Sequence, residues 1–218
     1  MSIPIQWGTY PLFRLFQMHA AIRHLRERDP VLAKVIERVG PGEIEFRAPS
    51  FDTLVRSMVF QQLSGKVARV IYDRLAGVMP GRQVTPEGIL KLRPDRMRRL
   101  GLSRQKTAYI RDLARQTAKG KIIFEVLPEL PDEEVIARLT MVKGIGVWTA
   151  HMFLIFALRR DNVLPTGDLG VRIAIKKAYG LADLPKPGEI EELARDWHPY
   201  CTAATWYLWR SLDGQAGI

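Results

Sequence analysis

The chain has 218 residues, of which 47% are hydrophobic and 26% are charged, enough apolar residues for a sizeable core. Its 33 Lys and Arg residues exceed its 23 Asp and Glu residues, and the net charge of +10 favours a polyanionic partner, either nucleic acid or an anionic membrane. A single cysteine, Cys201, excludes an intrachain disulfide, a four-cysteine iron–sulfur cluster and a zinc ribbon.

The N-terminal sequence MSIPIQWGTY lacks the basic start and apolar run of a secretory signal. The longest apolar stretch, residues 152–158, is too short to span a bilayer. We therefore expect a cytoplasmic protein that does not insert into a membrane.

In chain order, one strand is predicted first, at residues 43–47 (EIEFR), and every later element is predicted as a helix. Apolar residues in 51–59 follow the i, i+3, i+4 spacing of a buried helical face, and the spacing returns in 67–75 after a break at QQLSGK. Thr85, Pro86 and Glu87 have the pattern of a cap and first turn, so they predict a short helix. A longer helix is expected from Ser103 to Gly120.

Five more helices are predicted in the second half, one of them directly after the glycine stretch described below. One opens on the acidic run 132–134, and another opens on Asp168 and ends near Gly180. The last two run from Gly188 to Trp197 and from Tyr200 to Leu212. The helices are interrupted near residues 120–130, which suggests a boundary between two helical lobes.

The stretch MVKGIGVWTA, residues 141–150, breaks one helix with two glycines and begins the next at once. A dinucleotide-binding fingerprint would need a preceding strand and a third glycine where Thr149 stands. A hairpin between two helices explains both Gly144 and Gly146, because glycine allows positive φ and close approach of another backbone. The second helix then offers N–H groups to a phosphate, with Lys143 adding a positive charge.

The segment from this hairpin to Gly180 resembles the helix-hairpin-helix, Gly/Pro-rich loop and aspartate signature of the HhH-GPD DNA glycosylases, more narrowly 3-methyladenine DNA glycosylase II of the AlkA type. FQQLSGKVARVIYDRL, RLGLSRQKTAYIRDLA and ARDWHPYCTAATWYLW extend the resemblance over residues 45–213. It implies an all-α, two-lobed helical fold. We expect an N-terminal segment at 1–45 that packs on the helical core, a helical lobe with a wedge loop at 46–125, and a hairpin and catalytic lobe at 126–218.

The chain departs from the family in three respects. Larger members carry an N-terminal β-rich domain, of which only a stub would fit here. Lys143 stands where the hairpin often has proline. Cys201 stands where relatives tend to have arginine, and we interpret it, with His198 three residues earlier, as structural rather than as part of a metal site.

Asp168, in LPTGDLG, is the residue that the resemblance assigns to catalysis. As an isolated aspartate before a helix it would be interpreted as an N-cap. The two roles are compatible, because helix N–H groups favour the ionised carboxylate. An anion there would stabilise the positive charge that builds on the sugar when an N-glycosidic bond breaks.

The resemblance also implies an aromatic base pocket. Relatives that cut the DNA backbone have a lysine where Trp148 stands, and an indole cannot form a Schiff base, so a monofunctional enzyme is expected. Trp148 and Trp209 match pocket positions, with Met152 and Tyr207 able to line the same space. Electron-rich rings would attract a cationic alkylated purine. Core packing is the alternative for both tryptophans, and it is preferred for Trp197 and Trp206.

A base inside duplex DNA must be flipped out, and an apolar side chain can fill the gap that it leaves. Leu63 is the candidate wedge, with core packing as the alternative, and Gln62 is placed beside the orphaned base. The expected DNA contacts are Gln62, Leu63, Ser64, Lys143, Gly144, Gly146 and Thr149.

The resemblance requires no cofactor. In the family a monovalent cation often binds hairpin carbonyls, here those of Thr140, Val142 and Ile145. The expected protein is a monomeric, cytoplasmic enzyme, nucleoid-associated in a bacterium, that acts on double-stranded DNA with alkylated bases. The alternatives are a helix-hairpin-helix protein that only binds DNA and a glycosylase for oxidised or mismatched bases.

Overall fold

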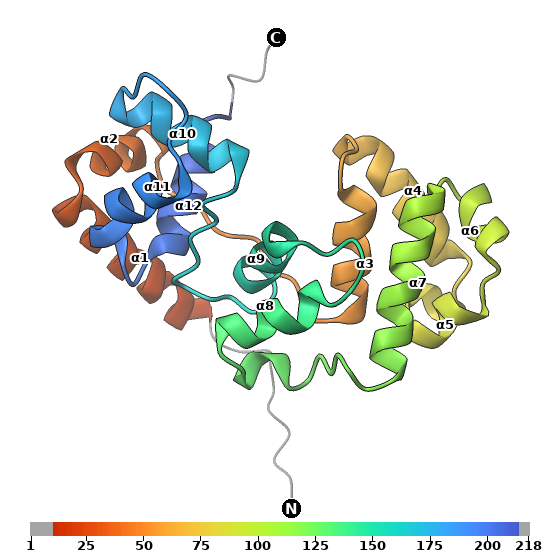
Figure 1. Cartoon of the computed structure of the whole chain (residues 1–218). Coiled ribbons are helices and arrows are strands. Elements are labelled where there is room, and N and C mark those ends of the chain that lie inside the picture. The colour runs from red at the N-terminus through yellow and green to blue at the C-terminus, as the bar shows by residue number, and fades with distance from the viewer. Residues whose placement is uncertain (1–10, 214–218) are drawn as a thin grey trace, which may run out of the picture. The chain divides into compact units, whose positions relative to one another are not determined.

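A computed structural model describes residues 11–213, with side chains from Met18 onward. Within this range the chain forms helices and loops without a strand, so the all-α fold is confirmed (Figure 1). The strand predicted at residues 43–47 was wrong: these residues are irregular. A lone extended segment has no partner for its backbone hydrogen bonds, so it cannot form a sheet.

The helices of the described part are, in order, α1 Pro11–Arg28, α2 Pro30–Val39, α3 Phe51–Phe60, α4 Gly65–Gly77, α5 Pro86–Lys91, α6 Pro94–Arg99, α7 Arg104–Ala118, α8 Asp132–Thr140, α9 Val147–Phe156, α10 Leu169–Tyr179, α11 Pro187–Leu193 and α12 Cys201–Arg210, with short 3₁₀ turns at Pro80–Arg82, Leu127–Glu129 and Ala194–Trp197. None of them is long and apolar enough to cross a membrane.

The chain divides into two compact units. The terminal unit comprises residues 1–44 and 161–218, drawn in red and blue, and the central unit comprises residues 45–160 (Figure 1). Both differ from the lobes expected at 46–125 and 126–218, because α8 and α9 belong with α3 to α7. Residues 1–10 of the expected N-terminal segment lie outside the described part.

The core of the terminal unit joins α1 and α2 to α10 and α12. Asp29 caps α2 by accepting hydrogen bonds from the N–H groups of Val31 and Leu32, both at 2.9 Å. Its other carboxylate oxygen accepts from the indole N–H of Trp197 at 2.7 Å and from the hydroxyl of Tyr179. This buried carboxylate therefore ties the first helices of the chain to the last.

The central unit is built on the helical faces that the sequence predicts, with Leu54, Val55, Met58 and Val59 of α3 fully enclosed. The predicted Thr85 cap is confirmed, because its hydroxyl accepts from the N–H of Gly88. The helix predicted from Ser103 is capped by that residue, whose hydroxyl accepts from the N–H of Lys106. The hydroxyl side chains of these two residues therefore determine where α5 and α7 begin.

The charge is divided unequally between the units. The central unit has 21 Lys and Arg residues against 11 Asp and Glu residues, whereas the terminal unit has 12 of each. The whole net charge of +10 thus belongs to the central unit, and any long-range attraction of a polyanion acts mainly on that unit.

Candidate functional site

Asp168 of the terminal unit is the N-cap of α10, as predicted. Its Oδ1 accepts a hydrogen bond from the N–H of Val171 at 2.7 Å. The residue is only 8% exposed. The carboxylate of Asp168 is thus nearly buried and is held in one orientation at the positive end of the helix.

Trp209 of α12 donates its indole N–H to the same Oδ1 at 2.9 Å. Gly170 leaves room for this contact: a Cβ at that position would lie 3.1 Å from Asp168 Oδ1 and 3.2 Å from Trp209 Cδ1, closer than ordinary van der Waals contact. The two predicted residues are therefore brought together, and Gly170 is a third participant that motif spacing alone did not single out. The orientation of the carboxylate depends on α12 as well as on its own helix.

Tyr207, also predicted for the base pocket, instead belongs to the core of the terminal unit, where it is fully buried and packs edge-to-face on Trp206. Along α12 it is two residues from Trp209, which places the two side chains on different faces of the helix. Trp197 and Trp206 are buried, so their interpretation as core residues is confirmed.

The hairpin of the central unit lies between α8 and α9. Gly144 has φ +87°, and a Cβ there would come within 2.1 Å of the Tyr109 ring of α7. Gly146 was expected to provide a positive φ or a close approach of another backbone, and it does neither. Its φ is −93°, and a Cβ would meet nothing within 4 Å. Only the first glycine is required by the fold, whereas the second is the N-cap of α9 and supplies no side chain there.

Two side chains from other helices hold the hairpin. The Gln61 amide donates to the carbonyl of Gly144 at 3.2 Å and to the Thr149 hydroxyl at 3.1 Å. Asp112 of α7 accepts from the backbone N–H of Lys143 at 3.1 Å. Burial acts to raise the pKa of Asp112, but this bond and Arg115 outweigh it and lower the pKa, so the carboxylate stays ionised.

Thr149 was predicted to contact DNA, yet the residue is 3% exposed and its hydroxyl accepts a hydrogen bond from the amide of Gln61. Only its backbone therefore remains available for a contact at the start of α9. Lys143 is exposed, as a phosphate contact requires.

The turn between α3 and α4 presents Leu63 at the surface with 38% of its side chain exposed, which rules out the core alternative. Gln62 and Ser64 on either side are exposed, and Gln62 has φ +56°. The turn is anchored by Lys106 of α7, whose ammonium donates to the carbonyls of Val59 and Gln61, both at 2.6 Å. Burial of this ammonium lowers its pKa.

Trp148 lies in the first turn of α9 with 44% of its surface exposed, and Met152, one turn later, is half-buried. His151 lies between them and was not singled out from the sequence. Burial lowers its pKa, against the opposing effect of Asp132, so it is neutral at pH 7. This helix thus offers an exposed indole beside a neutral imidazole.

Cys201 is fully buried at the start of α12, and burial raises the pKa of its thiol to about 12. A protonated, enclosed thiol is unreactive. Its role is therefore packing, as the sequence suggested.

The arrangement of helices matches known structures. The chain resembles a Schizosaccharomyces pombe 3-methyladenine DNA glycosylase (Mag1) in complex with abasic DNA, with a TM-score of 0.79 and 34% identity over 88% of this chain and 96% of that one. It is also similar to a DNA-3-methyladenine glycosidase from Bacillus halodurans, with a TM-score of 0.81, 34% identity and 90% coverage of both chains. Helix-hairpin-helix base-excision proteins are thus the class that the fold defines.

The sequence comparison agrees. Residues 55–199 match the model of the HhH-GPD superfamily of base excision DNA repair proteins. DNA-3-methyladenine glycosylase 1 of S. pombe is 34% identical over 182 residues, which cover 83% of this chain and 80% of that protein. The chain belongs to the HhH-GPD superfamily.

Proposed function

We propose that this protein is a monofunctional, AlkA-type DNA glycosylase that removes alkylated purines such as 3-methyladenine and 7-methylguanine from double-stranded DNA. The observation that carries the proposal is the carboxylate of Asp168, held by the N–H of Val171 and the indole of Trp209. The direct test is release of the free base from a duplex that contains one defined alkylated purine.

In the proposed reaction Asp168 acts as a fixed anion. Cleavage of the bond between base and sugar builds positive charge on the sugar, and a carboxylate oriented beforehand stabilises that charge without reorganising. It also orients the water that completes hydrolysis. Alkylation at N3 or N7 makes the purine cationic and a good leaving group, so no strong general acid is needed.

The proposed pocket is built on α9 of the central unit, from the indole of Trp148 and the side chain of Met152. The face of an indole attracts a cation, which favours an alkylated purine over a neutral one. Trp148 has 44% of its surface exposed and is therefore accessible to a flipped base. In the terminal unit, Trp209 orients the carboxylate of Asp168 through its indole N–H.

DNA is the proposed partner of the central unit, which carries the net charge of +10. The N–H groups at the start of α9 and the ammonium of Lys143 would bind the DNA backbone. Gly146 supports this role, since a cap without a side chain lets a phosphate approach those N–H groups.

The proposed monovalent cation is assigned to the backbone carbonyls of Thr140, Val142 and Ile145 at the hairpin. The Thr140 hydroxyl donates to the carbonyls of Ile136 and Ala137, and the oxygen assigned to the cation is the backbone carbonyl of Thr140. The carbonyl of Val142 accepts the N–H of Ile145 at 3.1 Å, which leaves a second lone pair. A bound cation would add positive charge beside the phosphate site.

The Leu63→Ala substitution is expected to slow excision from duplex DNA several-fold more than excision from single strands. The wedge matters only where a gap in the base stack must be held open. Because Leu63 is exposed, its removal should leave the melting temperature almost unchanged. Single-turnover rates on matched duplex and single-stranded substrates measure the effect, and equal losses on both would show that Leu63 is not a wedge.

Borohydride treatment during turnover is expected to trap no covalent complex. Trapping requires an amine that forms a Schiff base with the sugar, and the position that supplies it in lyase relatives is Trp148 here. Denaturing electrophoresis of enzyme on damaged DNA makes the measurement, with a lyase-proficient glycosylase as the positive control. A trapped band would mean that another amine of this chain attacks the sugar.

A further inference from the structure

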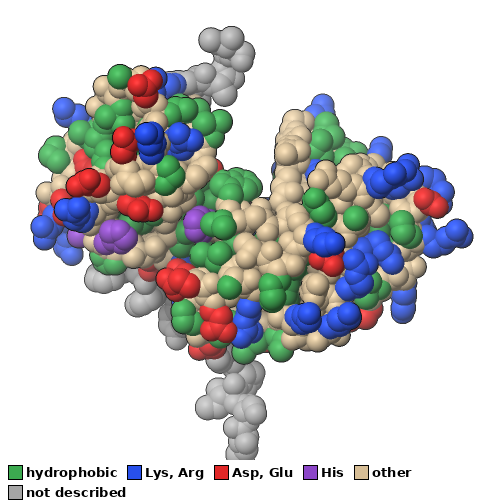
Figure 2. Space-filling model, viewed as in Figure 1, with side chains coloured by type: hydrophobic (Ala, Val, Ile, Leu, Met, Phe, Trp, Pro, Cys, Tyr) green, Lys and Arg blue, Asp and Glu red, His purple; other side chains and the backbone are tan. Residues whose placement is uncertain are grey.

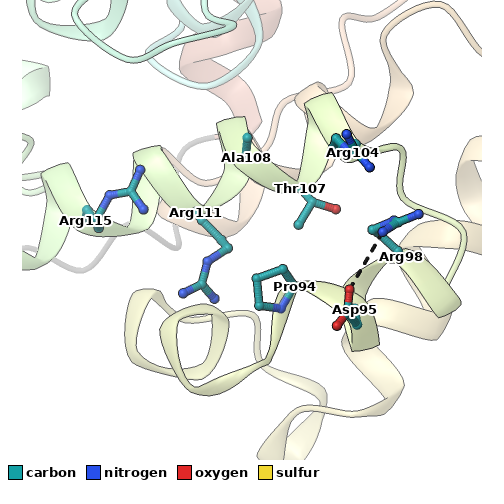
Figure 3. A pocket seen from close by; sticks show the side chains of 8 residues that line it. All are labelled: Pro94, Asp95, Arg98, Arg104, Thr107, Ala108, Arg111 and Arg115. Carbon is teal, nitrogen blue, oxygen red and sulfur yellow. Dashed lines mark ion pairs between the residues drawn. The ribbon is translucent and has the colours of Figure 1, made fainter.

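An open pocket of about 370 Å³ lies beside α6 and α7 of the central unit (Figure 3). Four arginines line it: Arg98, Arg104, Arg111 and Arg115. An adjoining hollow of about 560 Å³ shares Arg98 and Arg104 with it and adds Arg99. Asp95 is the one acidic residue in either lining.

The surrounding segment is the most basic part of the chain. Residues 91–121 contain 11 Lys and Arg residues against Asp95 and Asp112 alone. Figure 2 shows Lys and Arg side chains gathered over the surface of α5 to α7, with few acidic ones among them. A potential of this sign, concentrated in a hollow, attracts anions.

Thr107 of α7 lines the same pocket and lacks a partner for its hydroxyl. The residue is 3% exposed, and its Oγ1 forms no hydrogen bond. The hydroxyls of Thr117 and Thr140 instead donate to the carbonyls of Leu113 and Ile136, four residues earlier. Thr205 of α12 also has a buried hydroxyl without a partner, but it lines neither hollow, so only Thr107 combines the two features. A buried hydroxyl without a partner is unfavourable, so a ligand that supplies the partner would be favoured there.

The arginines of the pocket are not equally available. Arg111 donates to the carbonyl of Leu92 at 2.6 Å and so is fixed at the end of α5. Arg115 pairs with Asp112 at 3.2 Å, and Arg98 pairs with Asp95 at 3.7 Å. Arg104 takes part in none of the ion pairs found within residues 11–213. The structure therefore presents one uncommitted guanidinium close to one uncommitted hydroxyl.

We propose that this pocket binds a phosphate group, with the guanidinium of Arg104 and the hydroxyl of Thr107 as its ligands. Guanidinium groups bind phosphate through two parallel hydrogen bonds, and a hydroxyl can donate a third. The pocket is distinct from the hairpin: Arg104, Thr107 and Arg111 share one face of α7, whereas Tyr109 and Asp112 contact the hairpin from another. The phosphate is either a free phosphate ligand or one of the DNA backbone.

The test is a titration of the full-length protein with inorganic phosphate, followed by NMR of the backbone amides. Saturable shifts are expected at the start of α7. Thr107→Val, which keeps the shape of the side chain, and Arg104→Gln should each weaken binding about tenfold. Arg23→Gln, an exposed residue of α1, makes the same change of charge and should have no effect. Thr107→Val should also melt no lower than the parent, because it removes an unsatisfied hydroxyl.

The salt dependence of binding to an undamaged duplex distinguishes the two sources. If the phosphate belongs to DNA, Arg104→Gln should reduce the slope of log affinity against log salt by about one. If the slope is unchanged while phosphate binding is lost, the ligand is a free phosphate. Absence of saturable phosphate binding, or equal binding by the parent and both pocket variants, would overturn the proposal.

Discussion

Replacement of Asp168 by Asn is expected to slow single-turnover release of 3-methyladenine by about 10²- to 10³-fold or more, because an oriented group that stabilises developing charge contributes on that order. Asparagine has nearly the same shape. Its amide oxygen can still accept from the N–H of Val171 and the indole of Trp209. The change therefore removes the negative charge while keeping the cap.

Measurements of the melting temperature and of DNA affinity distinguish a loss of catalysis from a loss of structure in the Asp168→Asn variant. Asparagine caps helices about as well as aspartate, so the melting temperature should be close to that of the parent. DNA affinity should hold or rise, because an anion near the phosphates is lost. Asp183→Asn, an exposed residue of the same unit, is the matched control and should excise normally. If the Asp168→Asn variant melts, binds DNA and excises the base like the parent, Asp168 only caps α10 and is not catalytic.

The Gly144→Ala substitution is expected to cost about 2 to 5 kcal/mol of the free energy of unfolding. Alanine at φ +87° is strained, and its methyl group would come within 2.1 Å of the Tyr109 ring, so backbone and packing costs add. Because the carbonyl of Gly144 also accepts from Gln61, the hairpin should shift and DNA affinity should fall. Chemical denaturation and a binding titration measure the two effects.

Gly146→Ala is the matched control, since its φ is −93° and its surroundings are open. It should unfold at nearly the same denaturant concentration as the parent. Combining Gly144→Ala with Tyr109→Ala removes the clash and should recover part of the loss, leaving the backbone strain. Equal stability of the Gly144 and Gly146 variants would contradict this account of the hairpin.

Local signals in the sequence were sufficient to predict most of the helices. Thr85 and Asp168 act as the predicted caps, and Ser103 caps the helix that was predicted to begin there, since capping depends on residues only three apart. The helices α1 and α2 were missed, because the first 45 residues were treated as a single segment. They share a core with α10 and α12 and are linked to the 3₁₀ turn before α12 by the hydrogen bond from Trp197 to Asp29, a contact across 168 residues that no local pattern reveals.

The candidate site was predictable to the extent that the motif residues contact one another or the solvent directly. Asp168 and Trp209 do meet, and Leu63 is exposed. The side chains that anchor these segments were not predictable from motifs, because they lie far away in the sequence. Gln61 and Asp112 bind the hairpin, and Lys106 binds the turn between α3 and α4. Tyr207 was predicted to line the pocket because it is an aromatic residue near Trp209 in the sequence, but its side chain faces the core.

The central claim is that this chain removes alkylated purines from duplex DNA. Incubation with a panel of duplexes, each carrying one defined lesion, and analysis of the products for free base test it most directly. The account predicts release of 3-methyladenine and 7-methylguanine with an abasic but uncut strand, and slower or no release of uncharged oxidised or mismatched bases. Release confined to oxidised or mismatched bases, or DNA binding with no base released from any duplex, would contradict it.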